Sequence, residues 1–138
     1  MPATTLMKNE ILNFNFGAVA QTTIATMYFG LSTTLVTVAG LASSTEPATA
    51  NGYARVAFTN NQSTHWHNST ASSIHNDETV AFPQSTDSWG TILSLFISES
   101  GTRAAGDIWW YCTLSPSIAV PNLTTVTFAI GSIIFTAA

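Results

Sequence analysis

The stretch DSWGTILSLFIS, residues 87–98, decides the fold of this chain. It begins with a turn-prone Asp-Ser pair and continues after Gly90 in a run of β-branched and large apolar residues. Alternation along a strand divides this run into a wholly apolar face and a mixed face. The apolar face consists of Leu93, Leu95 and Ile97, and the mixed face consists of Ile92, Ser94, Phe96 and Ser98. This pattern predicts a central strand that is buried mainly on one side.

Other segments show the same two-residue period and are separated by Gly, Pro and Asn turn signals. In the segment 53–59, alternation predicts that Val56 and Phe58 face inward and that Tyr53, Arg55 and Ala57 share the other side. Residues 43–52, 99–106 and 115–122 are predicted connections. Further strands are predicted at 22–32, near Trp66, and at 80–82, 107–114, 124–130 and 132–136. About seven or eight short strands predict an all-β fold, namely a jelly-roll-like β-sandwich or barrel.

The N-terminal segment 7–17 has a different pattern. Leu12 and Phe16 are four residues apart, Ile11 lies beside them, and Gly17 is placed to end a helix. Asn-Phe alternation in the same segment is also compatible with a strand. We predict a short helix or arm over residues 1–20, followed by a single β-sandwich domain over residues 21–138.

The composition favours assembly. Only 7% of the 138 residues are charged, against about 25% in an average protein, while 46% are hydrophobic. Such a surface lacks the charges that keep a solitary protein from associating. We therefore expect a homo-oligomer, a dimer or trimer, with much of its surface covered by neighbours.

Several function classes are excluded by simple features. The net charge is −4, and Lys8, Arg55 and Arg103 are the only Lys and Arg residues, so nucleic acid is not an expected partner. No apolar run approaches the roughly 18 residues of a membrane-spanning helix, and the N-terminus lacks the apolar core of a secretion signal. The single Cys112 excludes an internal disulfide and is predicted to be a buried apolar residue.

The polar segment 60–76 contains all three histidines of the chain. His65 and His67 share a face if the segment is a strand, and His75 or Asp77 completes a candidate zinc site. The favoured interpretation is nevertheless that these are solvated loop histidines. We predict no metal and no other cofactor, and keep His65, His67 and His75 as the candidate ligands.

No catalytic site is predicted. Asp77, Glu78 and Asp87 supply carboxylates for glycoside hydrolysis, but no positioned partner accompanies them. A G-x-S-x-G nucleophile elbow, a phosphate loop and a dinucleotide fingerprint are all missing from the sequence. A small hydrolase on a β scaffold is therefore the least favoured interpretation.

The tryptophans are candidates for core packing, sugar stacking or an interface. Trp109 and Trp110 are adjacent in a predicted strand, so they point to opposite faces. Either one of them lies outside the main core or the strand is covered on both sides, which favours an interface. The candidate interface residues are Leu12, Phe14, Phe16, Trp66, Trp109 and Trp110.

An ordered set of short phrases runs through nearly the whole chain. The phrases are YFGLSTT (28–34), EP (46–47), GYARV (52–56), FP (82–83), SWGTI (88–92) and IWWY (108–111). Together they resemble a family of small virion proteins of tailed bacteriophages. Members are often labelled tail fibre protein, and some resemble capsid cement (decoration) proteins. The histidine-containing loop and Trp110 depart from the family pattern.

The resemblance implies a jelly-roll-like oligomer on the outside of an icosahedral shell. The preferred hypothesis is a non-enzymatic capsid cement protein, made in the host cytoplasm, that clamps neighbouring major capsid subunits and stabilises the shell by burying apolar surface. Residues 1–20 are the segment expected to reach a neighbour. The alternative is a tail-fibre or receptor-binding module whose exposed aromatic residues contact host glycans.

Overall fold

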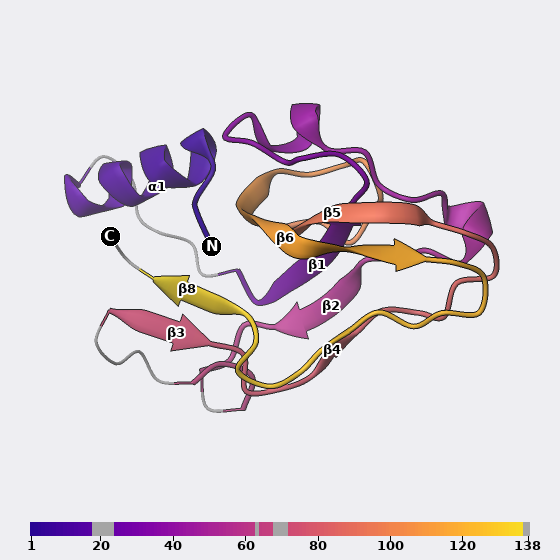
Figure 1. The fold of residues 1–138 in the computed structure, drawn as a ribbon. Helices are drawn as coiled ribbons and strands as arrows, with labels where there is room; N and C mark the ends of the chain where they lie inside the picture. Colours follow the sequence, from indigo (N-terminus) through magenta and orange to yellow (C-terminus); the bar gives the residue numbers. More distant parts are fainter. Residues whose placement is uncertain (18–23, 63, 68–71, 137–138) are drawn as a thin grey trace.

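The computed structural model describes residues 1–17, 24–62, 64–67 and 72–136 (Figure 1). This part of the chain contains one α-helix, α1 (Thr5–Asn15), and two short 3-10 helices, η1 (Gly40–Ser43) and η2 (Thr49–Asn51). The strands are β1 (Thr26–Ser32), β2 (Val56–Thr59), β3 (Ser73–His75), β4 (Val80–Ala81), β5 (Gly90–Ser98), β6 (Ile108–Val120), β7 (Thr127–Phe128) and β8 (Ile134–Thr136). The predicted all-β fold with a short N-terminal helix is confirmed.

The strands form one four-stranded sheet and two smaller ladders, all antiparallel. The large sheet has the order β2-β1-β5-β6, so β5 is an interior strand that pairs with β1 on one side and β6 on the other. The small ladders are β3-β8 and β4-β7. The main core contains residues from the large sheet and from the segments around both ladders, so it lies between them.

Both faces of β5 are buried, which corrects the prediction of burial mainly on one side. The register between β5 and β6 shifts after Ile92, where residues 92–94 lie opposite residues 113–118. This irregularity reverses the alternation, so Ile92 joins Leu95 and Ile97 in the main core while Leu93 is half-buried. Phe96 faces the other way, in a second cluster with Val36 and Ile108.

Strand β6 is longer than predicted. It continues through the cis Ser115–Pro116 peptide bond to Val120, although residues 115–122 were expected to form a connection. The irregularity opposite β5 accommodates this proline, which cannot donate a hydrogen bond to a regular ladder. A proline within a bulge can thus lie inside a strand, which the sequence pattern around Pro116 does not reveal.

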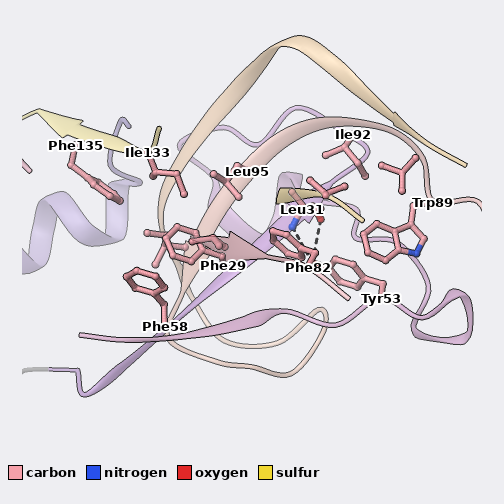
Figure 2. Close-up of a cluster of buried hydrophobic side chains, with 14 of the residues drawn as sticks. Phe29, Leu31, Tyr53, Phe58, Phe82, Trp89, Ile92, Leu95, Ile133 and Phe135 are labelled. Atoms are coloured by element: carbon pink, nitrogen blue, oxygen red, sulfur yellow. Dashed lines mark hydrogen bonds between the residues drawn. The ribbon is translucent and has the colours of Figure 1, made fainter. Parts of the chain in front are cut away.

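Aromatic rings fill much of the main core (Figure 2). Phe29 packs edge-on against Phe58, with ring centroids 5.2 Å apart, and Tyr53 packs edge-on against Trp89 at 5.3 Å. The Tyr53 hydroxyl accepts a hydrogen bond from the Leu31 amide at 2.9 Å, drawn as a dashed line in Figure 2. Such edge-to-face pairs are the arrangement that ring quadrupoles favour.

At Gly30, the backbone of β1 lies very close to a side chain of the neighbouring strand β5. A Cβ atom at this position would overlap the ring of Phe96, which is fully buried. The φ angle of Gly30 is not positive, so the requirement is for space rather than for a left-handed backbone. The ring of Phe96 therefore lies directly against the backbone of β1.

The first residues of the chain extend the large sheet. Residues 2–4 lie along β6, through a bridge between Ala3 and Trp110 and hydrogen bonds from Thr4 N to Trp109 O (2.8 Å) and from Tyr111 N to Pro2 O (3.1 Å). The Met1 ammonium group donates to Ile134 O at 2.8 Å. This arm covers part of the edge of β6, which limits uncontrolled pairing with other strands.

Candidate functional site

Helix α1 lies on the surface of the domain and exposes large apolar side chains. The Thr4 side chain caps its start by accepting from the Met7 amide at 3.4 Å, and Gly17, at a φ of 72°, follows its end as predicted. The helix contains no buried residue. A helix of a globular protein normally buries an apolar stripe against its own domain.

The apolar side chains of this segment are exposed to solvent. The exposed fractions are 39% for Leu6, 53% for Leu12, 47% for Phe14 and 83% for Phe16. Figure 1 shows α1 at one end of the molecule, beyond β8 and close to the N-terminus. We call Leu6, Leu12, Phe14 and Phe16 the helix surface. Residues 18–20 of the predicted arm lie outside the described residues.

The predicted interface residues divide into two groups. Leu12, Phe14 and Phe16 belong to the helix surface, whereas Trp66 is only 4% exposed and is part of the main core. Trp109 and Trp110 are half-buried on β6, and Trp110 packs edge-on against Phe135 with ring centroids 5.4 Å apart. None of the described tryptophans is an exposed stacking platform, because Trp89 is also buried.

An apolar cavity of about 390 Å³ lies beside the start of α1. Its lining includes Met7, Met27, Trp66, Ile74, Trp110 and Phe135. The indole Nε1 of Trp66 is buried and has no hydrogen-bond partner in the described part of the chain. Met7 of α1 contributes to the lining, so the cavity lies between the first turn of the helix and the core residues Trp66 and Phe135.

The histidines lie on a short two-stranded element rather than on an irregular loop. Trp66 and Asn76 form an antiparallel bridge, flanked by backbone hydrogen bonds from His67 N to His75 O (2.9 Å) and from Asp77 N to His65 O (2.7 Å). Trp66 and Asn76 are buried, so the neighbouring residues on both segments point outward. We call the outward residues His65, His67, His75 and Asp77 the histidine face.

Asn76 fixes this element to the rest of the domain. Its side-chain amide donates to the carbonyls of Glu78 (2.8 Å) and Ala129 (2.9 Å), and its Oδ1 accepts from the Ile133 amide at 2.9 Å. Its backbone carbonyl also accepts from the Gly131 amide at 2.8 Å. These bonds satisfy the side chain of a residue that is fully buried.

The structure brings three potential metal ligands together. One ligand atom each from His67, His75 and Asp77 lies within 4.8 Å of the other two. His65, which the sequence placed in the candidate set, instead pairs with Glu78 over 2.9 Å between Nε2 and Oε2. Asp77, named as a possible completing ligand, therefore takes the position expected for His65.

A buried ion pair between Glu46 and Arg55 was not predicted. Both side chains are fully buried, and Arg55 Nη2 and Nε donate to the two carboxylate oxygens of Glu46 over 2.7 and 2.9 Å. The carboxylate also accepts from the Tyr53 hydroxyl and the Ala104 amide, both at 2.8 Å. Arg55, expected to face outward, is thus the centre of an interior network.

The remaining donor group of Arg55 connects this pair to β5 and the following loop. Nη1 donates to Ser98 Oγ (2.9 Å), Ser100 O (2.6 Å) and Ala105 O (2.9 Å). The guanidinium also lies 5.2 Å from the centroid of the Phe96 ring. The predicted turn 99–106 is therefore attached to the domain by a charged residue. A signal for this existed in the sequence, since Arg55 and Glu46 are two of very few charges in an apolar chain.

The carboxyl group of Glu46 makes stability depend on pH. Burial by itself raises its pKa, but hydrogen bonds from Arg55 and the Ala104 amide and the charge of Arg55 outweigh burial, so the pKa lies below the ordinary 4.5. The stability that a carboxylate of lowered pKa contributes is present above pH 4.5 and is lost as the pH falls through the folded-state pKa.

We therefore expect the difference in unfolding free energy between wild type and Glu46→Gln to shrink as the pH falls below 4.5. Urea unfolding of both proteins at a series of pH values on either side of 4.5 measures this difference. A difference that stays constant across the series would contradict the assignment, because it would mean that Glu46 has the same pKa in the folded and unfolded states.

The structure is thus a β domain with a helix on its surface that exposes large apolar side chains. Residues 2–136 match the family model described as podophage GP4 fiber I protein gp80. The chain belongs to this family. It is therefore a structural protein of the phage virion, of the fibre type, and the resemblance to small phage virion proteins is confirmed.

None of the curated proteins searched matches the chain. In the described ranges of this fiber I family member, no helix combines the length and apolar content needed to cross a membrane.

Proposed function

We propose that this fiber I family member is a non-enzymatic fibre subunit of the podophage tail, attached to the particle through α1. The observation that carries the proposal is the helix surface, whose four large apolar side chains are 39% to 83% exposed although α1 buries no residue. Exposed apolar groups of this kind mark protein–protein contacts. The family description, fiber I protein, supports the tail rather than the shell.

The arrangement of the chain fits attachment by an anchor. Residues 1–4 hold the start of α1 against β6, while the helix itself contributes nothing to the core. A partner groove that receives an amphipathic helix is a common recognition mode. The β domain is then displayed away from the attachment point. Self-association into a dimer or trimer belongs to the same proposal, since the chain has few surface charges to oppose it.

Capsid cement is the second candidate, with the major capsid protein as the partner and the outer capsid surface as the location. The observation that favours it over a glycan-binding module is that Trp66 and Trp89 are buried and Trp109 and Trp110 half-buried, which leaves no described tryptophan as a platform for host glycans. A cement protein needs only lasting contacts with its neighbours. A fibre subunit without a glycan site is equally compatible with this observation.

The copy number per virion separates the two candidates. Quantitative mass spectrometry of purified particles against the major capsid protein measures it directly. A few dozen copies at most supports a tail fibre, because the tail occupies a single vertex. A ratio near one copy per capsid subunit, or one per few subunits, overturns the tail proposal and establishes a shell component.

We predict that the triple substitution Leu12→Ser, Phe14→Ser and Phe16→Ser abolishes incorporation into virions and leaves the domain folded. The three side chains are 47% to 83% exposed and none is buried, so the midpoint of urea unfolding should change little. The measurement is the amount of this chain in particles assembled with the variant.

A matched control replaces three exposed apolar residues elsewhere. The substitutions are Leu35→Ser, Leu123→Ser and Ile130→Ser, at residues that are 53%, 70% and 60% exposed. This variant should be incorporated like the wild type. Normal incorporation of the α1 variant, or equal loss in both variants, would show that the helix surface is not the anchor.

A further inference from the structure

We propose that His67, His75 and Asp77 form a Zn²⁺-binding site on the surface of the β domain. The three side chains come from two chain segments that a backbone bridge holds side by side. Imidazole nitrogens and a carboxylate oxygen are ordinary zinc ligands. A site with three protein ligands leaves a fourth position for water or for a group from a neighbouring molecule.

The backbone fixes the ligands before any ion binds. His67 and His75 lie opposite each other one step from the Trp66–Asn76 bridge, and Asp77 lies on the same outward face two residues beyond His75. The bridge is anchored on its inner side by the buried Trp66 and by the hydrogen bonds of Asn76. Metal affinity benefits from such preorganisation, because little chain entropy is lost on binding.

The distances suit an ion between the side chains better than direct contact between them. Asp77 Oδ2 lies 3.6 Å from His67 Nδ1, and Asp77 Oδ1 lies 3.7 Å from His75 Nε2. Both separations exceed the roughly 2.7–3.2 Å of a hydrogen bond. Zinc–ligand bonds of about 2.0–2.1 Å in a tetrahedron place ligand atoms roughly 3.3–3.4 Å apart. The ligand atoms lie within 4.8 Å of one another, so metal binding requires the exposed side chains to rotate and draw together around the ion.

His65 and Glu78, which lie next to this cluster, interact directly with each other instead. His65 and Glu78 are in direct contact at 2.9 Å, so His65 is already satisfied. The rings of His67 and His75 instead stack face to face, with centroids 4.5 Å apart and planes 11° apart. Because each imidazole nitrogen binds a metal in the plane of its ring, one or both rings must turn out of this stack for both histidines to bind the same ion.

The exposure of the three side chains and the types of their ligand atoms indicate which ion the site binds. The side chains of His67, His75 and Asp77 are 48%, 35% and 39% exposed, so an ion can enter without any opening of the domain. Two imidazoles among three ligands favour Zn²⁺ and similar transition metals over Mg²⁺ and Ca²⁺, which prefer oxygen ligands. Cys112, the single cysteine, is half-buried, and burial raises the pKa of its thiol, so it does not compete as a ligand.

The test is isothermal titration of Zn²⁺ into the full, untagged chain after removal of metals by a chelator. We expect one site per chain. His75→Gln and Asp77→Asn should each weaken binding by at least about tenfold, since each removes a direct ligand. The matched control is His65→Gln, which alters the same face outside the cluster and should retain the affinity of the wild type. Mg²⁺ at the same concentration should produce no binding heat.

A second readout keeps the proposal testable if a variant proves unstable. Zn²⁺ that binds only the folded state must raise the thermal midpoint of the wild type by mass action. Asp77→Asn and His75→Gln should show no such rise, and their midpoints without metal should equal that of the wild type, because the side chains are exposed. No binding heat and no midpoint shift for the wild type overturns the proposal. Equal loss in His65→Gln also overturns it, because binding would then not depend on the assigned ligands.

Discussion

Glu46→Gln is expected to lower the free energy of unfolding by about 3–5 kcal/mol, because it removes one partner of a buried ion pair. The neutral amide cannot balance the charge of Arg55, whose side chain is fully buried. The amide nitrogen would also face the Arg55 donors or the Ala104 amide, where only an acceptor fits. Domains have total stabilities of about 5–15 kcal/mol, so this single change removes a large share.

The measurement is urea unfolding followed by tryptophan fluorescence, with Glu78→Gln as the matched control. Glu78 pairs with His65 at the surface, and its side chain is 55% exposed, so the control should cost less than about 1 kcal/mol. Equal effects of the two substitutions would contradict the buried network. The double variant Glu46→Gln, Arg55→Met should cost less than the sum of the two single changes, since it removes both charges together.

Phe29→Ala is expected to cost about 3–5 kcal/mol, the usual cost of truncating a buried phenylalanine. Phe29 is 0% exposed, and its ring contacts Phe58 and Trp66 at centroid distances of 5.2 and 6.2 Å. The four-stranded sheet and the small ladders close over this ring, so the cavity left by alanine cannot collapse easily.

The same substitution on the helix surface is the control. Phe16 is 83% exposed, and Phe16→Ala should change stability by no more than about 0.5 kcal/mol. Both variants are measured by urea unfolding at neutral pH. A cost at Phe16 similar to that at Phe29 would show that α1 packs on the domain in solution, which would contradict the proposed anchor. Urea unfolding of Phe16→Ala and virion incorporation of the triple α1 variant therefore test the helix surface in two independent ways.

Sequence patterns predicted a structural feature correctly where the residues that determine it lie close together in the chain. Gly17 ends α1 because a glycine tolerates the positive φ that follows a helix, and this is visible in the sequence. The inward direction of Phe58 and the short strands between turn signals are also local properties. The exposure of Leu12, Phe14 and Phe16 agrees with their selection as interface residues, although their partner stays a proposal.

The predicted side-chain directions were wrong for residues whose contacts come from segments distant in sequence. Arg55 alternates with inward residues and was placed outside, but Glu46 and the carbonyls of Ser100 and Ala105 converge on it from two loops. A pattern of alternation cannot show that a charged side chain will find a buried partner. Ile92 lies on the opposite face of β5 from the one predicted. The irregularity that reverses its direction depends on the pairing of β5 with β6, which is distant in sequence.

The sequence by itself determined the all-β class and the low-charge surface, and it left the N-terminal segment as a helix or an arm, because periodicity, turn residues and composition are local quantities. Only the tertiary structure decided which side chains meet. It buried Glu46 with Arg55, moved Trp66 into the core, and placed Asp77 rather than His65 beside His67 and His75. These contacts join residues on different segments, and their positions follow from strand pairing and core closure, which no single stretch of sequence encodes.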